Sequence, residues 1–432
     1  MERMNYTYKK IWLVNFPVMT SILTEQLINI TDAVFLGHLG EVELGASALA
    51  SVWYLAIYML GFGFSLGLQS VIARYNGEKE YSETGKAFFQ GLFALSAMAV
   101  ALSLLSVWLS PAVLKKLIVS DEVYDAFCAY LEWRIWGLLF SFPFLALRSF
   151  LVGITQTGAL TVAAVTAVSV NIPGNYLFIF VSDMGISGAA IASSLSELCS
   201  LIILVSYVSG RMKKDFYGLR FRFDKSLLKY ILYVSVWSML QAFISVAPWF
   251  LFFVTIEHLG ESELAVANII RSISALFFVI VNSFATTAGA LAGNLLGAGK
   301  EKEVFPLCGR IIRLAYGVGV PLVVSALVFR RQVVGVYTGD ETLVALSWLP
   351  YTVMLLNYGF AVPGYVYMNA VIGTGGVKAA FLFQSITVLF YSVLLWGMSG
   401  RGVPLAVLWT VEWFFVIMLG IQSVVYLKVK HY

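Results

Sequence analysis

The sequence is poor in the residues that build metal sites and disulfide frameworks. It holds three histidines and three cysteines, Cys128, Cys199 and Cys308. An odd number of scattered cysteines argues against a disulfide framework, and neither residue type shows the spacing of metal ligands. We therefore expect no bound metal and no cofactor at these side chains.

Charge is also scarce. Charged residues make up 12% of the chain and hydrophobic residues 60%. A water-soluble protein of this length could not keep so much apolar surface from water, so the surroundings must be lipid. No polar stretch is long enough to form a soluble catalytic domain, which argues against an enzyme. The first apolar run, from Ile11, is too long for a signal-peptide core, so we expect no cleaved leader.

Apolar runs long enough to cross a bilayer, which takes roughly 20 residues each, recur along the whole chain. Twelve transmembrane helices are expected at 11–36, 45–73, 85–110, 126–152, 159–181, 187–209, 228–256, 265–295, 307–330, 343–371, 379–398 and 403–427. The longest polar break, 210–227, predicts a linker between an N-lobe (1–209) and a C-lobe (228–432).

A short motif marks an internal duplication. The heptapeptide His-Leu-Gly-Glu-x-Glu-Leu at 38–44 returns at 258–264, and Gly77 is answered by Gly297 at the same shift of 220 residues. Six spans per half is an even number, so both halves enter the membrane in the same direction. The predicted fold is an all-α polytopic membrane protein of two parallel six-helix repeats around a central cleft. The motif falls in a loop after the first helix of each half, so we expect it to shape that loop.

The positions of Lys and Arg predict the orientation. With the N-terminus inside, 20 of the 28 Lys and Arg residues fall in inside segments, five fall outside and three lie within spans. Lys and Arg concentrate on the cytoplasmic side of membrane proteins, so we expect both termini in the cytoplasm. The net charge of +4 then reflects topology, and no basic-aromatic motif indicates a nucleic acid.

The first span carries the most informative polar residues. Four of them, spaced four, four and three residues apart, share one helix face: Ser21, Glu25, Asn29 and Asp32. A carboxylate in hydrocarbon is costly and normally faces the protein interior or a water-filled cavity. Glu25 and Asp32 are therefore candidates for binding a coupling proton or cation. The alternative is that one of them is the buried salt-bridge partner of Arg134 or Arg148.

The fifth span offers a second polar face. Asn171 and Asn175 lie four residues apart, and Pro173 and Gly174 between them interrupt the helix. Such an interruption frees backbone carbonyls that can line an ion site. The alternative is hydrogen bonding between helices by the two Asn side chains. Two further acids, at 197 and 412, fall at similar places in the sixth and twelfth spans, and we expect them to hold each half together.

These features resemble the multidrug and toxic compound extrusion (MATE) family. The resemblance rests on the two six-helix halves, a first helix with Pro17, and four segments, at 29–37, 171–180, 185–193 and 297–300. It covers essentially the whole chain. It implies a secondary active transporter that exports organic, often cationic, compounds by antiport with H⁺ or Na⁺ through alternating access. We expect it to work as a monomer in the bacterial inner membrane, among lipid.

The resemblance also implies residue roles. Asp32 would be the cation-binding carboxylate, with a possible Na⁺ held by it and four neighbours: Tyr130, Asn171, Asn175 and Ser193. Pro17 would be the bend that opens and closes the N-lobe cavity. We expect the substrate cavity to be lined by Glu25, Gln26, Asn29 and Arg148. Several relatives have an Asp at the position of Asn175, and relatives commonly have a Gln at the position of Glu25. The second acid of the site would therefore have moved from the fifth helix to the first.

The second half lacks matching acids. The repeat shift places Ser245 and Phe252 opposite Glu25 and Asp32. The many C-lobe aromatics would then form an apolar cavity wall, or simply pack. An alternative function within the superfamily is a flippase for lipid-linked oligosaccharides. That function needs cationic residues along the cavity for a pyrophosphate, whereas the expected stripe is acidic.

Overall fold

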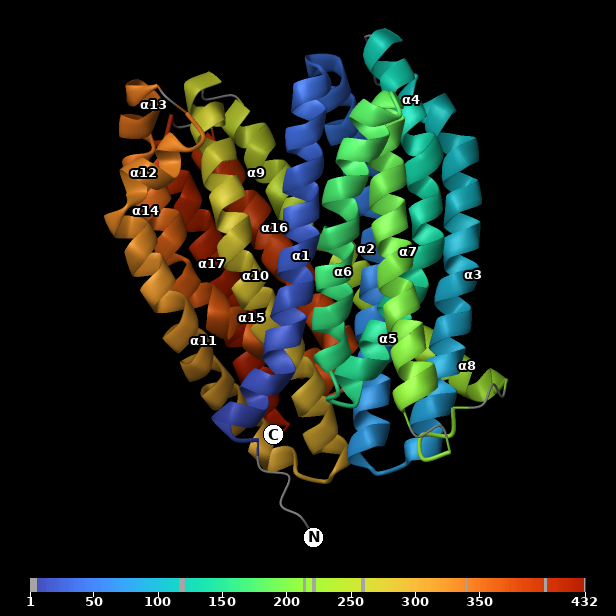
Figure 1. Ribbon diagram of the computed structural model, residues 1–432. Coiled ribbons are helices and arrows are strands. Elements are labelled where there is room, and N and C mark those ends of the chain that lie inside the picture. Colours follow the sequence, from blue (N-terminus) through green and yellow to red (C-terminus); the bar gives the residue numbers. More distant parts are fainter. Residues whose placement is uncertain are drawn as a thin grey trace.

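The chain folds into a bundle of long helices that run side by side (Figure 1). The computed structural model describes residues 6–115, 121–212, 215–219, 223–257, 261–338, 340–399, 402–430 and 432. No strand occurs in these ranges. Helix α1 begins and α17 ends at the same end of the bundle, here named the terminal end (Figure 1).

The first half contains seven α-helices, a 3-10 turn and a π-helical segment. They are α1 (Tyr8–Leu39), α2 (Glu41–Gly77), α3 (Tyr81–Leu114), α4 (Asp121–Arg134), the 3-10 turn η1 (Ile135–Gly137), α5 (Leu138–Gly153), α6 (Gly158–Tyr176), the π-helix η2 (Leu177–Val181) and α7 (Gly185–Arg211). Helices α4, η1 and α5 follow one another and form a single span.

The second half is more interrupted. It contains α8 (Lys225–Ile244), α9 (Ala247–Glu257), α10 (Glu261–Gly297), the 3-10 turn η3 (Glu301–Glu303), α11 (Val304–Val328), α12 (Arg330–Gly335), α13 (Glu341–Leu346), α14 (Trp348–Leu356), α15 (Tyr358–Gly373), α16 (Val377–Ser399) and α17 (Leu405–Val429). Pro248 explains the break between α8 and α9, because proline has no N–H to donate to the carbonyl four residues earlier, that of Ile244.

The expected spans are present as helices. Eleven helices of the described part are long and apolar enough to cross a membrane. The remaining span, expected as one helix at 343–371, is divided into α13, α14 and α15 at Ser347 and Asn357. Its backbone hydrogen bonds continue across the second break, where the Ala361 N–H donates to the Asn357 carbonyl at 2.8 Å. The all-α polytopic fold is thereby confirmed. Two expected spans are corrected: the seventh (228–256) is divided into α8 and α9, and the tenth (343–371) is broken into three helices.

The duplication is visible in the positions of these breaks. The fourth span of the first half is broken at Gly137, and its counterpart is broken at Asn357, 220 residues later. After the break, each span contains a proline within its next helix, Pro143 in α5 and Pro363 in α15, and these two prolines are also 220 residues apart. The two lobes therefore share the broken fourth span as well as the order of their helices.

The lobes meet closely near the terminal end. The Asn76 Nδ2 donates to the Asn294 Oδ1 at 2.5 Å, joining the ends of α2 and α10. A Cβ added to Gly77 would lie 2.1 Å from the Asn294 carbonyl oxygen, and one added to Gly297 would lie 1.9 Å from that of Arg74. Each of these repeat-related glycines thus lets the other helix's backbone approach, as only glycine can.

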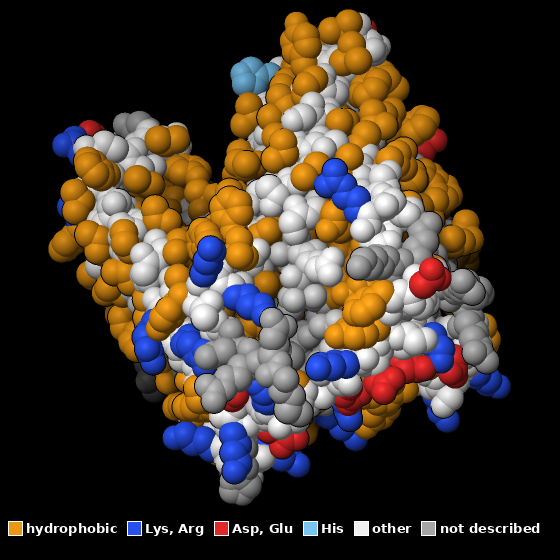
Figure 2. All heavy atoms as spheres, turned by 60° about the horizontal axis from the view of Figure 1, so that its bottom comes forward, with side chains coloured by type: hydrophobic (Ala, Val, Ile, Leu, Met, Phe, Trp, Pro, Cys, Tyr) orange, Lys and Arg blue, Asp and Glu red, His pale blue; other side chains and the backbone are white. Residues whose placement is uncertain are grey.

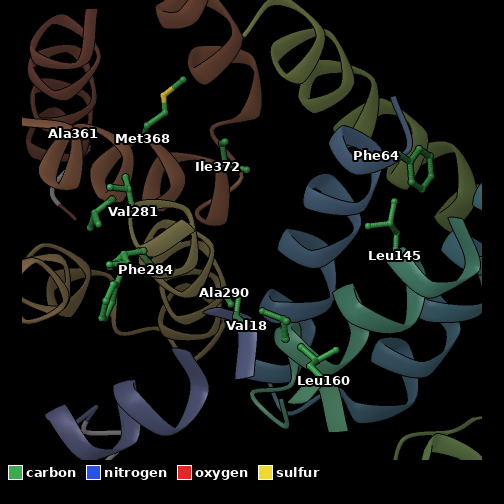
Figure 3. Packing of buried hydrophobic residues seen from close by; sticks show 14 of the residues in the cluster. Val18, Phe64, Leu145, Leu160, Val281, Phe284, Ala290, Ala361, Met368 and Ile372 are labelled. Carbon is green, nitrogen blue, oxygen red and sulfur yellow. The ribbon is translucent and has the colours of Figure 1, made fainter. Parts of the chain in front are cut away.

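Further contacts close the same end. The Ser70 Oγ on α2 donates to the Ile372 carbonyl on α15 at 2.9 Å. Apolar packing continues inward from this end, where Val18 of α1, Leu160 of α6 and Ala290 of α10 are fully buried and lie close together (Figure 3). Away from the terminal end the halves diverge, and a notch separates them in the space-filling view (Figure 2). The structure is therefore closed at the terminal end and open at the other.

Candidate functional site

The Asp32 carboxylate sits at the meeting point of three helices. Asp32 on α1 is 9% exposed. Its Oδ1 accepts from the Nδ2 of Asn171 at 3.1 Å and from the Nδ2 of Asn175 at 2.6 Å, both on α6. Its Oδ2 accepts from the Ser193 Oγ on α7 at 2.5 Å. The structure thus brings together four of the residues expected at the cation site.

The donors around Asp32 are also joined to one another. Asn175 donates to the Asn171 Oδ1 at 3.2 Å, and Asn171 also reaches the Ser193 Oγ at 3.2 Å. Directly after Tyr176, α6 gives way to the π-helix η2. Single π-helical turns inside α-helices often mark functional sites. A Cβ on Gly188 of α7 would lie 2.7 Å from the Phe178 backbone, so this glycine lets α7 approach η2.

One buried oxygen of this cluster has no protein partner. The Asn175 Oδ1 makes no hydrogen bond within the described ranges, although it is buried. Such orphaned oxygens are rare in folded proteins and call for an explanation. A carboxylate, an amide oxygen and a hydroxyl are the oxygen ligands that a hard cation takes, and the carboxylate is equally able to take a proton. No group of three His, Cys, Asp or Glu comes together in the described part of the chain, at this cluster or away from it.

Tyr130 lies beside this cluster and makes no hydrogen bond to the carboxylate itself. It is 3% exposed on α4. Its hydroxyl interacts with Ser51 of α2, and it lies within electrostatic range of Asp32. Tyr130 therefore ties α4 to α2 at the level of the Asp32 cluster.

Arg134 has a partner that the sequence pattern did not predict. Its Nη2 lies 2.7 Å from the Glu197 Oε1 and its Nη1 lies 3.0 Å from the Oε2, a two-point contact between α4 and α7. The Tyr54 ring packs 3.8 Å from the guanidinium carbon. Neither Glu25 nor Asp32 is therefore the salt-bridge partner of Arg134, and Glu197 holds the N-lobe together as expected. No spacing in the sequence identifies this pairing, because its residues are far apart along the chain.

Glu25 and Arg148 lie within electrostatic range of each other. Glu25 is half-buried on α1, two turns from Asp32. Arg148 on α5 is 4% exposed, and its Nε and Nη2 have no hydrogen-bond partner among the described residues. The two side chains are near enough to attract each other electrostatically, yet they form no direct ion pair in the described chain.

The other expected cavity residues are more open. Gln26 is half-buried and Asn29 is exposed, so the polar stripe is buried at Ser21 and Asp32 and opens at Asn29. Pro17 lies inside α1 without ending the helix.

Thr157, which sequence reasoning missed, donates to two carbonyls of the helical turn before Pro17, one of which, that of Leu13, Pro17 leaves free. Its Oγ1 donates to the Val14 carbonyl at 3.1 Å and reaches the Leu13 carbonyl at 3.4 Å. The signal for such a donor is the proline itself, because it deprives Leu13 of its helical partner.

The C-lobe has no counterpart of the Asp32 cluster among its described residues. Phe252 is fully buried and packs with its ring centroid 4.8 Å from that of Trp409. Ser245 ends α8 and donates to the carbonyl of Ala242. Tyr351 and Tyr358 are buried and donate to backbone carbonyls. These aromatics therefore pack within the lobe.

Comparison with known proteins agrees with this architecture. The MatE family model matches two segments, 17–177 and 237–396, whose first residues are 220 apart. The chain is 22% identical over 348 residues to "Probable multidrug resistance protein NorM" of Pasteurella multocida, covering 78% of this chain and 75% of the relative. It is 24% identical over 354 residues to the protein of the same name from Photorhabdus laumondii, covering 78% and 76%.

Solved structures share the fold. One, described as the outward-facing conformation of a multidrug resistance MATE family transporter of the MOP superfamily, superposes with a TM-score of 0.92 at 17% identity, covering 98% of this chain and 96% of the other. A MOP superfamily transporter from Pyrococcus furiosus, described by the reverse polarity of its binding pocket, superposes with a TM-score of 0.90 at 17% identity and the same coverage. With the family model matched in both halves, the chain belongs to the MatE family of membrane transporters, which are not enzymes.

Proposed function

We propose that the protein is a secondary active efflux transporter that exchanges H⁺ or Na⁺ for organic, often cationic, compounds. One observation carries the proposal: the buried Asp32 carboxylate is held by three neutral donors and makes no ion pair with a fixed cation among the described residues. A carboxylate in that setting is stabilised by a mobile cation or by a proton.

The cluster has the parts that a coupling site needs. Asn171, Asn175 and Ser193 hold the carboxylate in place, and the orphaned Asn175 Oδ1 is an additional ligand for Na⁺. Ion and cationic substrate would compete for the negative charge of the N-lobe, and such competition is the basis of exchange. Pro17 and Thr157 would then serve as the bend of α1 during opening and closing.

Alternating access fits the way the lobes meet. The lobes are in contact at the terminal end through Asn76, Asn294 and the two glycines, and they diverge at the other end. Rocking one lobe against the other would open the terminal end and close the opposite end. Lys and Arg side chains gather over the terminal end (Figure 2), which supports a cytoplasmic location for both termini. We place the protein in the bacterial inner membrane as a monomer.

A flippase for lipid-linked oligosaccharides is the second candidate. Arg148 favours it, because a guanidinium with two unbonded nitrogens is suited to a pyrophosphate. Glu25 and Asp32 on the facing helix oppose it, because they would repel a polyanion.

Transport by Asp32→Asn in proteoliposomes tests the main proposal. Efflux of a cationic dye would be driven by a Na⁺ gradient and by a pH gradient in separate experiments, with a protonophore as control. We expect the natural protein to respond to one of the gradients and the variant to respond to neither, while it elutes as a folded species in detergent. Ion-driven efflux by the variant at the natural rate would overturn the assignment of Asp32.

A further inference from the structure

Two adjacent arginines lie at the end of the molecule opposite the terminal end. Helix α11 ends at Val328, and Arg330 and Arg331 begin the short helix α12, which lies at that end together with α13 (Figure 1). Most Lys and Arg residues fall in segments predicted to be inside, and these two do not. They are exceptions to the usual cytoplasmic bias of positive charge. Such an exception calls for a function at this end of the C-lobe.

The two arginines line a pocket between α12, α13 and α14, here named the arginine pocket. Its volume is about 300 Å³. Its polar and aromatic lining residues are Arg330, Arg331, Glu341, Ser347, Trp348 and Tyr351. Ser347 and Tyr351 are buried and donate their hydroxyls to backbone carbonyls of the same lobe. The polar groups left to bind a ligand are therefore the charged ones.

The two arginines differ in their partners. The Arg331 Nη2 lies 2.7 Å from the Glu341 Oε1, and these side chains are 72% and 75% exposed. An ion pair so exposed adds little to stability, but it offsets the only carboxylate that lines the pocket. Arg330 makes no ion pair or hydrogen bond with a described residue, and its guanidinium carbon lies 4.6 Å from the centre of the Trp348 ring. The arginine pocket thus keeps a net positive charge.

The surface beside the arginine pocket is apolar. Val328 and Phe329, which directly precede the arginines, are exposed, and so are Trp348 and Leu349. Trp is enriched at the level where the headgroups of a bilayer meet the acyl chains. An amphipathic anion can therefore place its charge at the arginines and its chains along this apolar surface. A small inorganic anion would use the arginines alone.

We propose that the arginine pocket binds the phosphodiester of an anionic phospholipid, whose acyl chains lie along Val328, Phe329 and Leu349. A guanidinium presents a fork of N–H donors that matches two phosphate oxygens. Arg330 has no competing acidic partner, and Arg331 uses only Nη2 on Glu341. In the orientation proposed above, the lipid comes from the outer leaflet. This site is separate from the Asp32 cluster and lies in the other lobe.

A fluorescent reporter at the pocket tests this assignment. A polarity-sensitive dye is attached through Gln332→Cys on α12, in a chain without its native cysteines. The protein is placed in phosphatidylcholine nanodiscs that contain rising fractions of phosphatidylglycerol, a lipid with one anionic phosphodiester. The dye should respond to phosphatidylglycerol, and the fraction that gives half of the response measures its apparent affinity. Inorganic phosphate added to nanodiscs of phosphatidylcholine alone should give no response.

Three changes of charge predict opposite effects. A basic side chain near a membrane surface is worth about fivefold in the binding of an anionic lipid, so Arg330→Gln should weaken the apparent affinity about fivefold. Adding Arg331→Gln should bring the loss to about 25-fold. Glu341→Gln should instead tighten binding, because it leaves the charge of Arg331 without its counter-charge. Arg271→Gln in α10 is the matched control and should leave the affinity unchanged.

The outcome decides between a lipid site, a free-anion site and no site. An equal response to inorganic phosphate would replace the lipid with a free anion and overturn the proposal. Equal affinities of Arg330→Gln and Arg271→Gln would remove the arginine from binding. Weaker binding in Glu341→Gln would show that the ion pair only shapes the pocket. Arg330→Gln leaves the Arg331–Glu341 pair intact, so it decides the matter even where the double variant fails to fold.

Discussion

The inner face of the first helix carries Glu25 and Asp32 in the N-lobe, whereas the repeat-related positions of the C-lobe hold Ser245 and Phe252. The acid positions of one lobe thus correspond to a helix end and an aromatic core contact in the other. Both lobes keep the broken fourth span, so the architecture was retained while the charges were not. The difference supports the proposal that the ion site lies in the N-lobe, with the C-lobe as the body against which that lobe would move.

The acids of the sixth and twelfth spans extend this comparison. Glu197 in the N-lobe is held by Arg134 at 2.7 Å. Glu412 in the C-lobe accepts from the Tyr391 hydroxyl at 2.6 Å. The first acid is part of an ion pair and the second is bonded to a neutral donor. Removing one partner should therefore cost much more stability in the N-lobe than in the C-lobe.

The largest effect is expected in transport. Asp32→Asn should abolish ion-driven efflux, whereas Glu412→Gln should keep most of it, because an amide can still accept from Tyr391. Both variants are measured side by side in proteoliposomes under the same gradient. Loss of efflux in Glu412→Gln, with the protein folded, would give the C-lobe a part in coupling and break the comparison.

The next largest effect concerns stability. Arg134→Gln leaves the mostly buried Glu197 without its counter-charge, and such changes cost about 3–5 kcal/mol. Glu412→Gln should cost less than about 1 kcal/mol, the worth of one neutral hydrogen bond. Denaturant unfolding in detergent gives both values. Equal losses would mean that the ion pair does not distinguish the lobes.

A smaller effect is expected where the lobes cross. Gly77→Ala and Gly297→Ala each place a Cβ against a backbone oxygen of the facing helix, and such overpacking costs about 1–3 kcal/mol. Gly317→Ala in α11 is the matched control, because an added Cβ there meets nothing within 4 Å.

The effect of the two glycines on the contact between α2 and α10 is measured as the distance between the lobes. Spin labels at positions 79 and 302, in a chain without its native cysteines, report the distance across the terminal end. Both glycine variants should lengthen that distance and the control should not. An unchanged distance in both would remove the glycines from the closure of this end.

The smallest effect concerns the bend of α1. Thr157→Val removes the donor to the Leu13 and Val14 carbonyls, at a cost of about 1 kcal/mol. In a Pro17→Ala background the loss should shrink, because alanine at this position supplies the N–H that proline lacks. Additive losses in a double-mutant cycle would show that Thr157 does not compensate for Pro17.

Much of the fold was accessible from sequence because lipid imposes long apolar helices. The twelve spans and the repeat follow from hydropathy and the motif at 38–44. The break at Asn357 was missed, since its flanks are as apolar as any continuous span. Pro248 is a sequence signal for the break before α9, although hydropathy alone predicts one continuous span there.

The site was accessible in part. The spacing of Asn171 and Asn175 predicted that these two side chains share one helix face. The polar face of α1 predicted the buried positions of Ser21 and Asp32, whereas its Asn29 is exposed. The resemblance supplied Ser193. Contacts between distant residues were not predictable, because helix spacing says nothing of which helices face each other. The Arg134–Glu197 pair and the Thr157 donor to α1 are of this kind. The separation of Glu25 from Arg148 depends on packing and has no sequence signature.

Ion release on substrate binding tests the central claim most directly, that the coupling ion binds at Asp32 in the N-lobe. A cationic substrate is added to the purified protein, and released protons are followed with a pH dye or displaced Na⁺ with a radioactive tracer. The natural protein should release one of the two ions, Asp32→Asn should release neither, and Glu412→Gln should match the natural protein. Undiminished release from Asp32→Asn would contradict the account.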